Sequence, residues 1–149
     1  MAVLRERPYG RFNFLVDFGN GSDSFEAGFQ ECSPISSSVT LYEYRNGNER
    51  NNATRKLPGL TKYDDVTLKR GLIGSLNLYD WYNQFRNGDV GAVRNVTISL
   101  QNEDHTATVM TWKLFNAIPV KYSAGPLNGK GTDVAVEELT LAYERLEIE

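Results

Sequence analysis

Short stretches of alternating apolar and polar residues run through most of the chain and predict β-strands. In the first stretch, residues 11–18, Phe12, Phe14, Val16 and Phe18 fall at every second position. A period of two is typical of a half-buried strand, because successive side chains point to opposite faces of a sheet. The same pattern predicts further strands over residues 24–31, 39–45, 66–72, 94–101, 107–116 and 133–148. Turn formers at residues 19–23 predict a hairpin between residues 11–18 and 24–31, and residues 125–131, between the last two strands, predict a loop.

One segment has the period of a helix. Leu78, Trp81, Tyr82 and Phe85 recur at i, i+3, i+4 and i+7, which predicts an amphipathic helix packed against a sheet. We expect Asn77 to cap its N-terminus and Gly88 to end it in a left-handed conformation. Six to seven antiparallel strands with one flanking helix define a mainly β protein, a sandwich or barrel. Its expected core residues include Phe14, Leu78, Trp81, Tyr82, Phe85 and Trp112.

The periodicity stops over residues 46–60, where turn formers and charges predict a long loop or a flexible hairpin. Loops of this length usually either act at a surface or are disordered. Residues 45–70 carry seven basic and three acidic residues, a net charge of +4, and residues 133–149 carry one basic and six acidic, a net charge of −5. Such segments can attract copies of one molecule head to tail. A mixed-charge surface without that purpose is the alternative that these counts alone favour.

Composition narrows the class of protein. The chain has 149 residues, 40% of them hydrophobic, which suits one domain with a substantial core. A net charge of −3, and few aromatic residues among the basic ones, argue against specific nucleic-acid recognition. No apolar stretch approaches the roughly 18 residues of a membrane span, and the first residues do not resemble a signal peptide. Synthesis in a reducing cytoplasm is therefore expected, in agreement with the single Cys32.

Residues for catalysis are few. His105 and Cys32 are single residues of their types, so we expect no metal site, no cofactor and no catalytic centre. His105 falls in a predicted turn, where a solvated side chain is expected. The glycines of residues 125–131 do not match the spacing of a phosphate-binding loop. The residues thus argue against an enzyme.

Seven blocks of sequence stand in order along residues 9–146: YEYRNG (42–47), LPG (57–59), VTLKRG (66–71), LYDW (78–81), RNVTI (94–98), WKLFNAIP (112–119) and VAVEELTL (134–141). In this order and at these intervals they resemble the tube proteins of contractile phage tails, and most of all those of extracellular contractile injection systems. The resemblance implies a fold shared with the haemolysin-coregulated protein of type VI secretion. It also implies one tail-tube domain over residues 1–149.

The resemblance further implies a structural role. Six copies would form a ring, and rings would stack into a hollow inner tube that sheath contraction expels. The implied partners are further copies of the chain, a sheath protein, baseplate and terminator or cap proteins, and a tape-measure protein or cargo in the lumen. The particle would be a phage tail or an injection particle assembled in bacteria and, in some systems, released from them.

In the family, the long loop contacts the adjacent ring, so the resemblance assigns that role to residues 45–62 and their neighbours. Its polar composition predicts mobility in the lone subunit and ordering on assembly. Two alternatives stay open: a tube initiator or baseplate hub component of the same fold, and a β-sandwich that binds a ligand through Tyr42, Tyr44 and Tyr63. The expected stacking residues are Tyr44, Arg45, Asn46, Gly47, Asn48, Glu49, Arg50, Arg55, Lys56, Leu57, Pro58 and Gly59.

Overall fold

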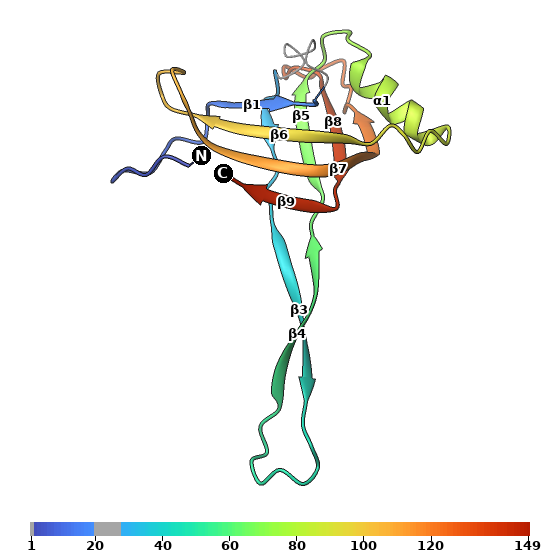
Figure 1. The fold of residues 1–149 in the computed structure, drawn as a ribbon. Coiled ribbons are helices and arrows are strands. Elements are labelled where there is room, and N and C mark those ends of the chain that lie inside the picture. The colour runs from blue at the N-terminus through green and yellow to red at the C-terminus, as the bar shows by residue number, and fades with distance from the viewer. Residues whose placement is uncertain (1, 20–27) are drawn as a thin grey trace.

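The computed structural model describes residues 2–19 and 28–149 (Figure 1). These residues form nine strands and one helix, and all strand pairs are antiparallel, so the predicted mainly β class with one helix is confirmed. The elements are β1 (Phe14–Asp17), β2 (Glu31–Cys32), β3 (Ser37–Tyr44), β4 (Arg55–Tyr63), β5 (Val66–Gly71), α1 (Asn77–Arg86), β6 (Arg94–Gln101), β7 (Thr108–Ala124), β8 (Val136–Ala142) and β9 (Arg145–Ile148).

The long strand β7 joins two groups of strands. Its first part pairs with β6 on one edge and with β9 on the other, and β1 pairs with β6. Its last part, from Ile118 onward, pairs with β8, which continues to β5 and β2. The chain passes between the groups at Asn116, whose φ of 54° is left-handed, a conformation that Asn tolerates. One strand therefore belongs to both sides of the core.

The core lies between these groups of strands. Alternate residues of β5, β6 and β8 point inward, as the period of two predicts. Helix α1 adds Leu78 and Trp81, and the indole N–H of Trp81 donates to the carbonyl oxygen of Ala92 at 2.6 Å. The Phe18 ring lies 5.4 Å from the Trp81 ring. The hydrophobic strand residues with no exposed surface are Val66, Leu68, Val96, Leu114, Ala117, Leu139 and Leu141.

Helix α1 begins one residue earlier than an Asn77 cap would require. Leu76 occupies the N-cap position and no side chain caps the helix, so the prediction of an Asn77 cap is wrong: Asn77 is already helical. Gly88 follows the helix with φ of +93°, as predicted. Tyr82 and Phe85 are partly buried and pack against the core.

Two predicted strand arrangements near the N-terminus differ from the structure. The first strand is only Phe14–Asp17, and Phe12 is exposed, because β6 provides partners only from Thr97 to Leu100. The predicted hairpin of residues 11–18 with residues 24–31 falls partly on residues 20–27, which lie outside the described residues. Its described ends pair elsewhere, β1 with β6 and β2 with β5.

The strand predicted over residues 107–116 is longer in the structure, whereas the loop predicted at residues 125–131 is confirmed. Strand β7 continues to Ala124, and Pro119 lies buried inside it, opposite Leu141 and next to a register shift. A register shift tolerates proline because one ladder hydrogen bond is already missing there. The single strand predicted over residues 133–148 is two strands, because the chain bends between Ala142 and Arg145.

Strands β3 and β4 form a hairpin that projects far from the rest of the protein (Figure 1). Of the two predictions for residues 46–60, the hairpin is correct and the long loop is wrong, since β4 occupies residues 55–63. Pro58 and Gly59 suggested a turn, but they lie in β4 beside a register shift between Val39 and Leu41. At about 3.3 Å per residue, the eight residues of β3 extend about 26 Å.

Candidate assembly surfaces

The β3–β4 hairpin carries large apolar side chains that nothing in the described structure covers. All eight residues of β3 are exposed, and the hairpin pairs with no other strand. A two-stranded ribbon is marginally stable by itself in water, and clustered exposed apolar side chains mark interaction sites. The exposed apolar residues, between 47% and 77% accessible, are Val39, Leu41, Tyr42, Tyr44, Leu57 and Leu60.

These side chains occupy both faces of the hairpin. Tyr42 lies opposite Leu57 on one face, and Leu41 lies opposite Pro58 on the other, since neighbours along a strand alternate. The Tyr42 ring packs over Gly59, where a Cβ atom would come within 2.2 Å of a ring carbon. Glycine is therefore required at this position. A partner that covered only one face would leave the other exposed to water.

The tip of the hairpin is organised by its own side chains. The Arg45 guanidinium donates to the carbonyl oxygens of Glu49 at 2.9 Å and Asn51 at 3.1 Å. Arg55 forms an ion pair with the Glu49 carboxylate at 3.2 Å. The Tyr44 hydroxyl and Asn46 are also hydrogen-bonded. Two of the expected stacking cations, Arg45 and Arg55, therefore support the hairpin itself.

The remaining expected stacking residues lie at the tip or along β4. Gly47 and Asn48 form the turn, and Lys56 follows Arg55 in β4. No hydrogen bond or ion pair engages the side chains of Arg50 or Lys56 within residues 2–19 and 28–149, and both are exposed. Of the four expected stacking cations, Arg50 and Lys56 are therefore the two whose charges are available to another molecule.

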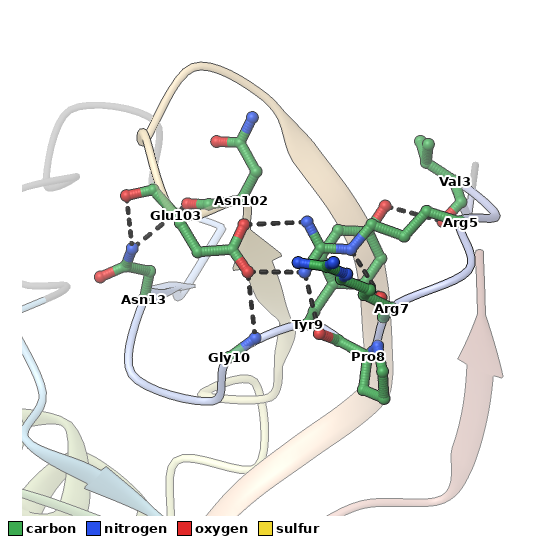
Figure 2. Close-up of polar contacts among 9 residues, drawn as sticks. All are labelled: Val3, Arg5, Arg7, Pro8, Tyr9, Gly10, Asn13, Asn102 and Glu103. Carbon is green, nitrogen blue, oxygen red and sulfur yellow. Dashed lines mark hydrogen bonds and ion pairs between the residues drawn. The ribbon is translucent and has the colours of Figure 1, made fainter.

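An N-terminal arm precedes β1 and is fastened to the turn between β6 and β7 (Figure 2). The Arg5 guanidinium donates to both carboxylate oxygens of Glu103, at 2.6 and 3.0 Å, and to the carbonyl oxygens of Arg7 and Pro8. Its central carbon lies 3.8 Å from the centre of the Tyr9 ring. This bidentate pair holds the pKa of Glu103 at about 2, well below its ordinary value.

The arm also continues an edge of the sheet. The backbone N–H of Val3 donates to the carbonyl oxygen of Val109, and Glu149 exchanges two backbone hydrogen bonds with Thr111. Both chain ends thus lie along one edge of β7. Local sequence patterns do not indicate the Arg5–Glu103 pair, because its members are 98 positions apart.

A buried ionic cluster lies inside the core. Arg70 of β5 and Glu137 of β8 are directly opposite, with Arg70 Nε 2.5 Å from Glu137 Oε1. The Tyr122 hydroxyl donates to Glu137 Oε2 at 2.6 Å. Burial, and then the Glu137 carboxylate, raise the pKa of Tyr122 to about 12. Arg70 Nη2 is buried without a hydrogen-bond partner among the described residues.

The predicted lone residues do not form a chemical site in the part of the chain that the structure describes. His105 is exposed in the turn before β7, with its Nδ1 3.1 Å from Gln101 Oε1. Burial raises the pKa of the Cys32 thiol to about 11, which makes it a weak nucleophile at neutral pH. No three His, Cys, Asp or Glu residues gather as metal ligands among the described residues. The one described helix is too short and too polar to cross a bilayer.

The predicted core residues lie on four elements. Leu78 and Trp81 of α1 are fully buried, whereas Tyr82 and Phe85 are partly buried. Phe14 of β1 and Trp112 of β7 are also partly buried and pack against the core.

The described residues form a strand-rich body with a projecting hairpin and exposed apolar side chains. Comparison with known proteins gives the family of the chain. The family model described as T4-like virus tail tube protein gp19 matches residues 10–147. The chain therefore belongs to this family of tail tube proteins. No curated protein matches the chain significantly.

Solved structures agree with this assignment. A chain of the PVC extracellular contractile injection system, in its sheath-tube complex in the extended state, is 29% identical, with a TM-score of 0.83 over 97% of this chain and 93% of that one. A chain of the anti-feeding prophage baseplate is 26% identical, with a TM-score of 0.81 over 97% of each chain. Hcp1 from Flavobacterium johnsoniae, at 14% identity, shares the fold, with a TM-score of 0.52 over 92% of this chain and 94% of Hcp1. The predicted likeness to tail tube proteins is thus confirmed.

Proposed function

We propose that the chain is the inner tube subunit of a contractile injection system or a contractile phage tail. Six copies form a ring, and rings stack into a hollow tube that the contracting sheath expels. The protein performs no reaction and acts as a single tail-tube domain. The observation that carries the proposal is the β3–β4 hairpin, which extends beyond the core with apolar side chains on both faces.

The strand edges support lateral joining of copies. Within the described residues, β1, β2 and β9 each pair with one strand only, so each has an unpaired edge. Unpaired edges favour aggregation in a monomer, but in a ring they pair with the neighbouring copy and close the sheet. The subunit then uses two different surfaces: the strand edges join copies within a ring, and the hairpins join successive rings.

The family and the solved relatives support a proposal for the partners and the location of the protein. We propose that the tube meets a sheath protein outside, a baseplate at one end, a terminator or cap at the other, and a tape-measure protein or cargo in its lumen. The PVC relative comes from a sheath-tube complex, and the other relative comes from a baseplate. The subunit is made in the bacterial cytoplasm and assembles into a virion-like particle that some systems release.

Electron microscopy of the purified protein over a range of concentrations tests this function. We expect rings and stacked tubes that lengthen with concentration. A hairpin variant, Leu41→Asp with Leu57→Asp, should keep the circular dichroism spectrum of the subunit and lose tubes. The matched control, Thr40→Asp with Thr61→Asp, changes two polar hairpin residues and should still form tubes. Single subunits at every concentration would contradict the proposal.

A tube initiator in the baseplate is the second candidate, and the likeness to a chain of the anti-feeding prophage baseplate favours it. An initiator would form isolated rings that never lengthen, so the same microscopy separates the two functions. A ligand-binding module through Tyr42, Tyr44 and Tyr63 has less support. Tyr63 packs against Tyr143 with ring centres 5.6 Å apart, whereas Tyr42 and Tyr44 lie on the projecting hairpin.

A further inference from the structure

Three of the described asparagines are followed by a glycine and lie at exposed positions. Such a pair is chemically reactive, because glycine has no side chain to shield its backbone nitrogen, which can approach and attack the amide carbon of the asparagine. The attack needs an asparagine side chain that is free to turn toward the backbone and a glycine nitrogen that no hydrogen bond holds. The three pairs are Asn46–Gly47, Asn87–Gly88 and Asn128–Gly129.

The Asn87 pair lacks a free glycine nitrogen. The backbone N–H of Gly88 donates to the carbonyl oxygen of Phe85 at 3.1 Å, where helix α1 ends. The backbone N–H of Asn87 donates to the carbonyl oxygen of Asn83 at 3.0 Å. The Gly88 nitrogen cannot turn toward the asparagine side chain unless the last turn of the helix opens. The end of the helix therefore protects this pair.

The Asn46 pair lacks a free asparagine side chain. Its Oδ1 accepts a hydrogen bond from the Tyr44 hydroxyl, and its Nδ2 donates to Glu49 Oε1 at 3.3 Å. Because Nδ2 is the nitrogen that must leave, its bond to Glu49 has to break first. The Glu49 carboxylate also opposes the negative charge that develops on Oδ1 during the attack. Two hydrogen bonds and an unfavourable charge therefore slow the reaction at Asn46.

The Asn128 pair meets both requirements. Asn128 Oδ1 accepts the backbone N–H of Lys130 at 3.0 Å, the hydrogen bond of an Asx turn, which folds the side chain back over its own backbone. Within residues 2–19 and 28–149, no hydrogen bond engages the Gly129 nitrogen or Asn128 Nδ2. The Lys130 N–H points at the oxygen on which negative charge develops. It therefore stabilises the tetrahedral intermediate of the attack, as the donors of an oxyanion hole do.

We propose that Asn128 is the site of a spontaneous modification, its deamidation through a cyclic imide formed with Gly129. The Gly129 nitrogen gives up its proton and forms a bond to Asn128 Cγ, the bond from Cγ to Nδ2 breaks, and ammonia leaves with that proton. Water then opens the imide at either carbonyl and leaves aspartate or isoaspartate. Each event adds one negative charge to the loop between β7 and β8. The modification does not depend on the proposed tube function.

Peptide mapping by mass spectrometry of the full-length chain, kept at mildly alkaline pH, measures the conversion of each asparagine with time. We expect Asn128 to react at least about tenfold faster than Asn46 or Asn87, because at least one hydrogen bond must break first at each of those sites. In urea, where the fold no longer holds these bonds, the three rates should converge. Equal rates in the folded protein, or a preference for Asn128 that persists in urea, would overturn the inference.

Substitution of the following glycine gives an independent test. Gly129→Ala should slow the reaction at Asn128 at least about tenfold, because the added methyl group shields the attacking nitrogen. No atom lies within 4 Å of a Cβ atom at Gly129, so the circular dichroism spectrum should not change. The matched control, Gly47→Ala, also adds a Cβ atom with no neighbour within 4 Å and should leave the rate at Asn128 unchanged. An unchanged rate in Gly129→Ala, or an equal loss in the control, would overturn the inference.

Discussion

Removing the carboxylate of Glu137 should destabilise the subunit strongly, because it leaves a buried charge without its counterion. Arg70 and Glu137 are 3% and 1% exposed, and their side chains form the 2.5 Å ion pair between β5 and β8. In Glu137→Gln the side chain keeps nearly the same size, but the Arg70 guanidinium loses its negative partner. Since Arg70 Nη2 already lacks a partner among the described residues, no spare acceptor there compensates.

The expected cost follows from the burial. Breaking a buried ion pair by removing one partner costs about 3–5 kcal/mol, whereas replacing both partners by apolar residues of similar volume is often neutral or stabilising. Glu137→Gln should therefore lower the free energy of unfolding by about 3–5 kcal/mol. The double variant Arg70→Met with Glu137→Leu should recover most of this loss. Tyr122→Phe, which removes one hydrogen bond to the carboxylate, should cost about 1.5–3 kcal/mol.

Urea unfolding of the unassembled subunit, followed by circular dichroism, measures these free energies. The matched control is Glu149→Gln, which breaks the exposed ion pair with Lys113 at 2.8 Å and should change the free energy of unfolding far less than Glu137→Gln, because solvent screens an exposed pair. A loss below about 1 kcal/mol for Glu137→Gln would show that water reaches the cluster. A double variant that is less stable than the single one would refute the argument that desolvation dominates.

Three further predictions concern ionisable side chains. In an NMR titration the Glu103 carboxyl should have a pKa of about 2 rather than its ordinary 4.5. The ionised carboxylate therefore stabilises the docked N-terminal arm fully above about pH 4.5, and this stabilisation is lost as the pH falls toward 2. A pKa near 4.5 would show that the arm is not docked. The Cys32 thiol should react with iodoacetamide about tenfold faster per pH unit up to about pH 11, and a plateau near pH 9 would contradict its burial. Arg50→Glu with Lys56→Glu should shorten tubes without changing the fold, whereas the exposed control Lys121→Glu should not; equal tube lengths would remove these cations from stacking.

Regular periodicity is what made parts of this fold predictable. The pattern predicts strand β6 and helix α1 almost to the residue, because each keeps one period along its whole length. In β6, Val96 and Ile98 follow the period of a strand, and in α1, Leu78 and Trp81 follow the period of a helix. The continuation of β7 was missed because Pro119 suggests a turn when read alone. It is accommodated because the register with β8 shifts between Pro119 and Lys121, where β7 has one extra residue, and a single segment of sequence does not show where such a shift falls.

Contacts between distant residues were not predictable from local patterns. Arg5 and Glu103 each suggest a solvated surface charge, and only the fold brings them together. Glu137 likewise suggested part of an acidic terminal strand, yet it is buried against Arg70. The stacking role of residues 44–59 came from the family resemblance, and it stays a proposal. Alternation shows which face of a strand is apolar but does not identify the molecule that covers it.

Cryo-electron microscopy of the protein at a concentration that permits assembly tests the central claim most directly. The account predicts stacked rings around a continuous bore, with each β3–β4 hairpin seated on a copy in the next ring. Particles no larger than one subunit, or a tube in which the hairpins extend into solvent without a contact, would contradict it.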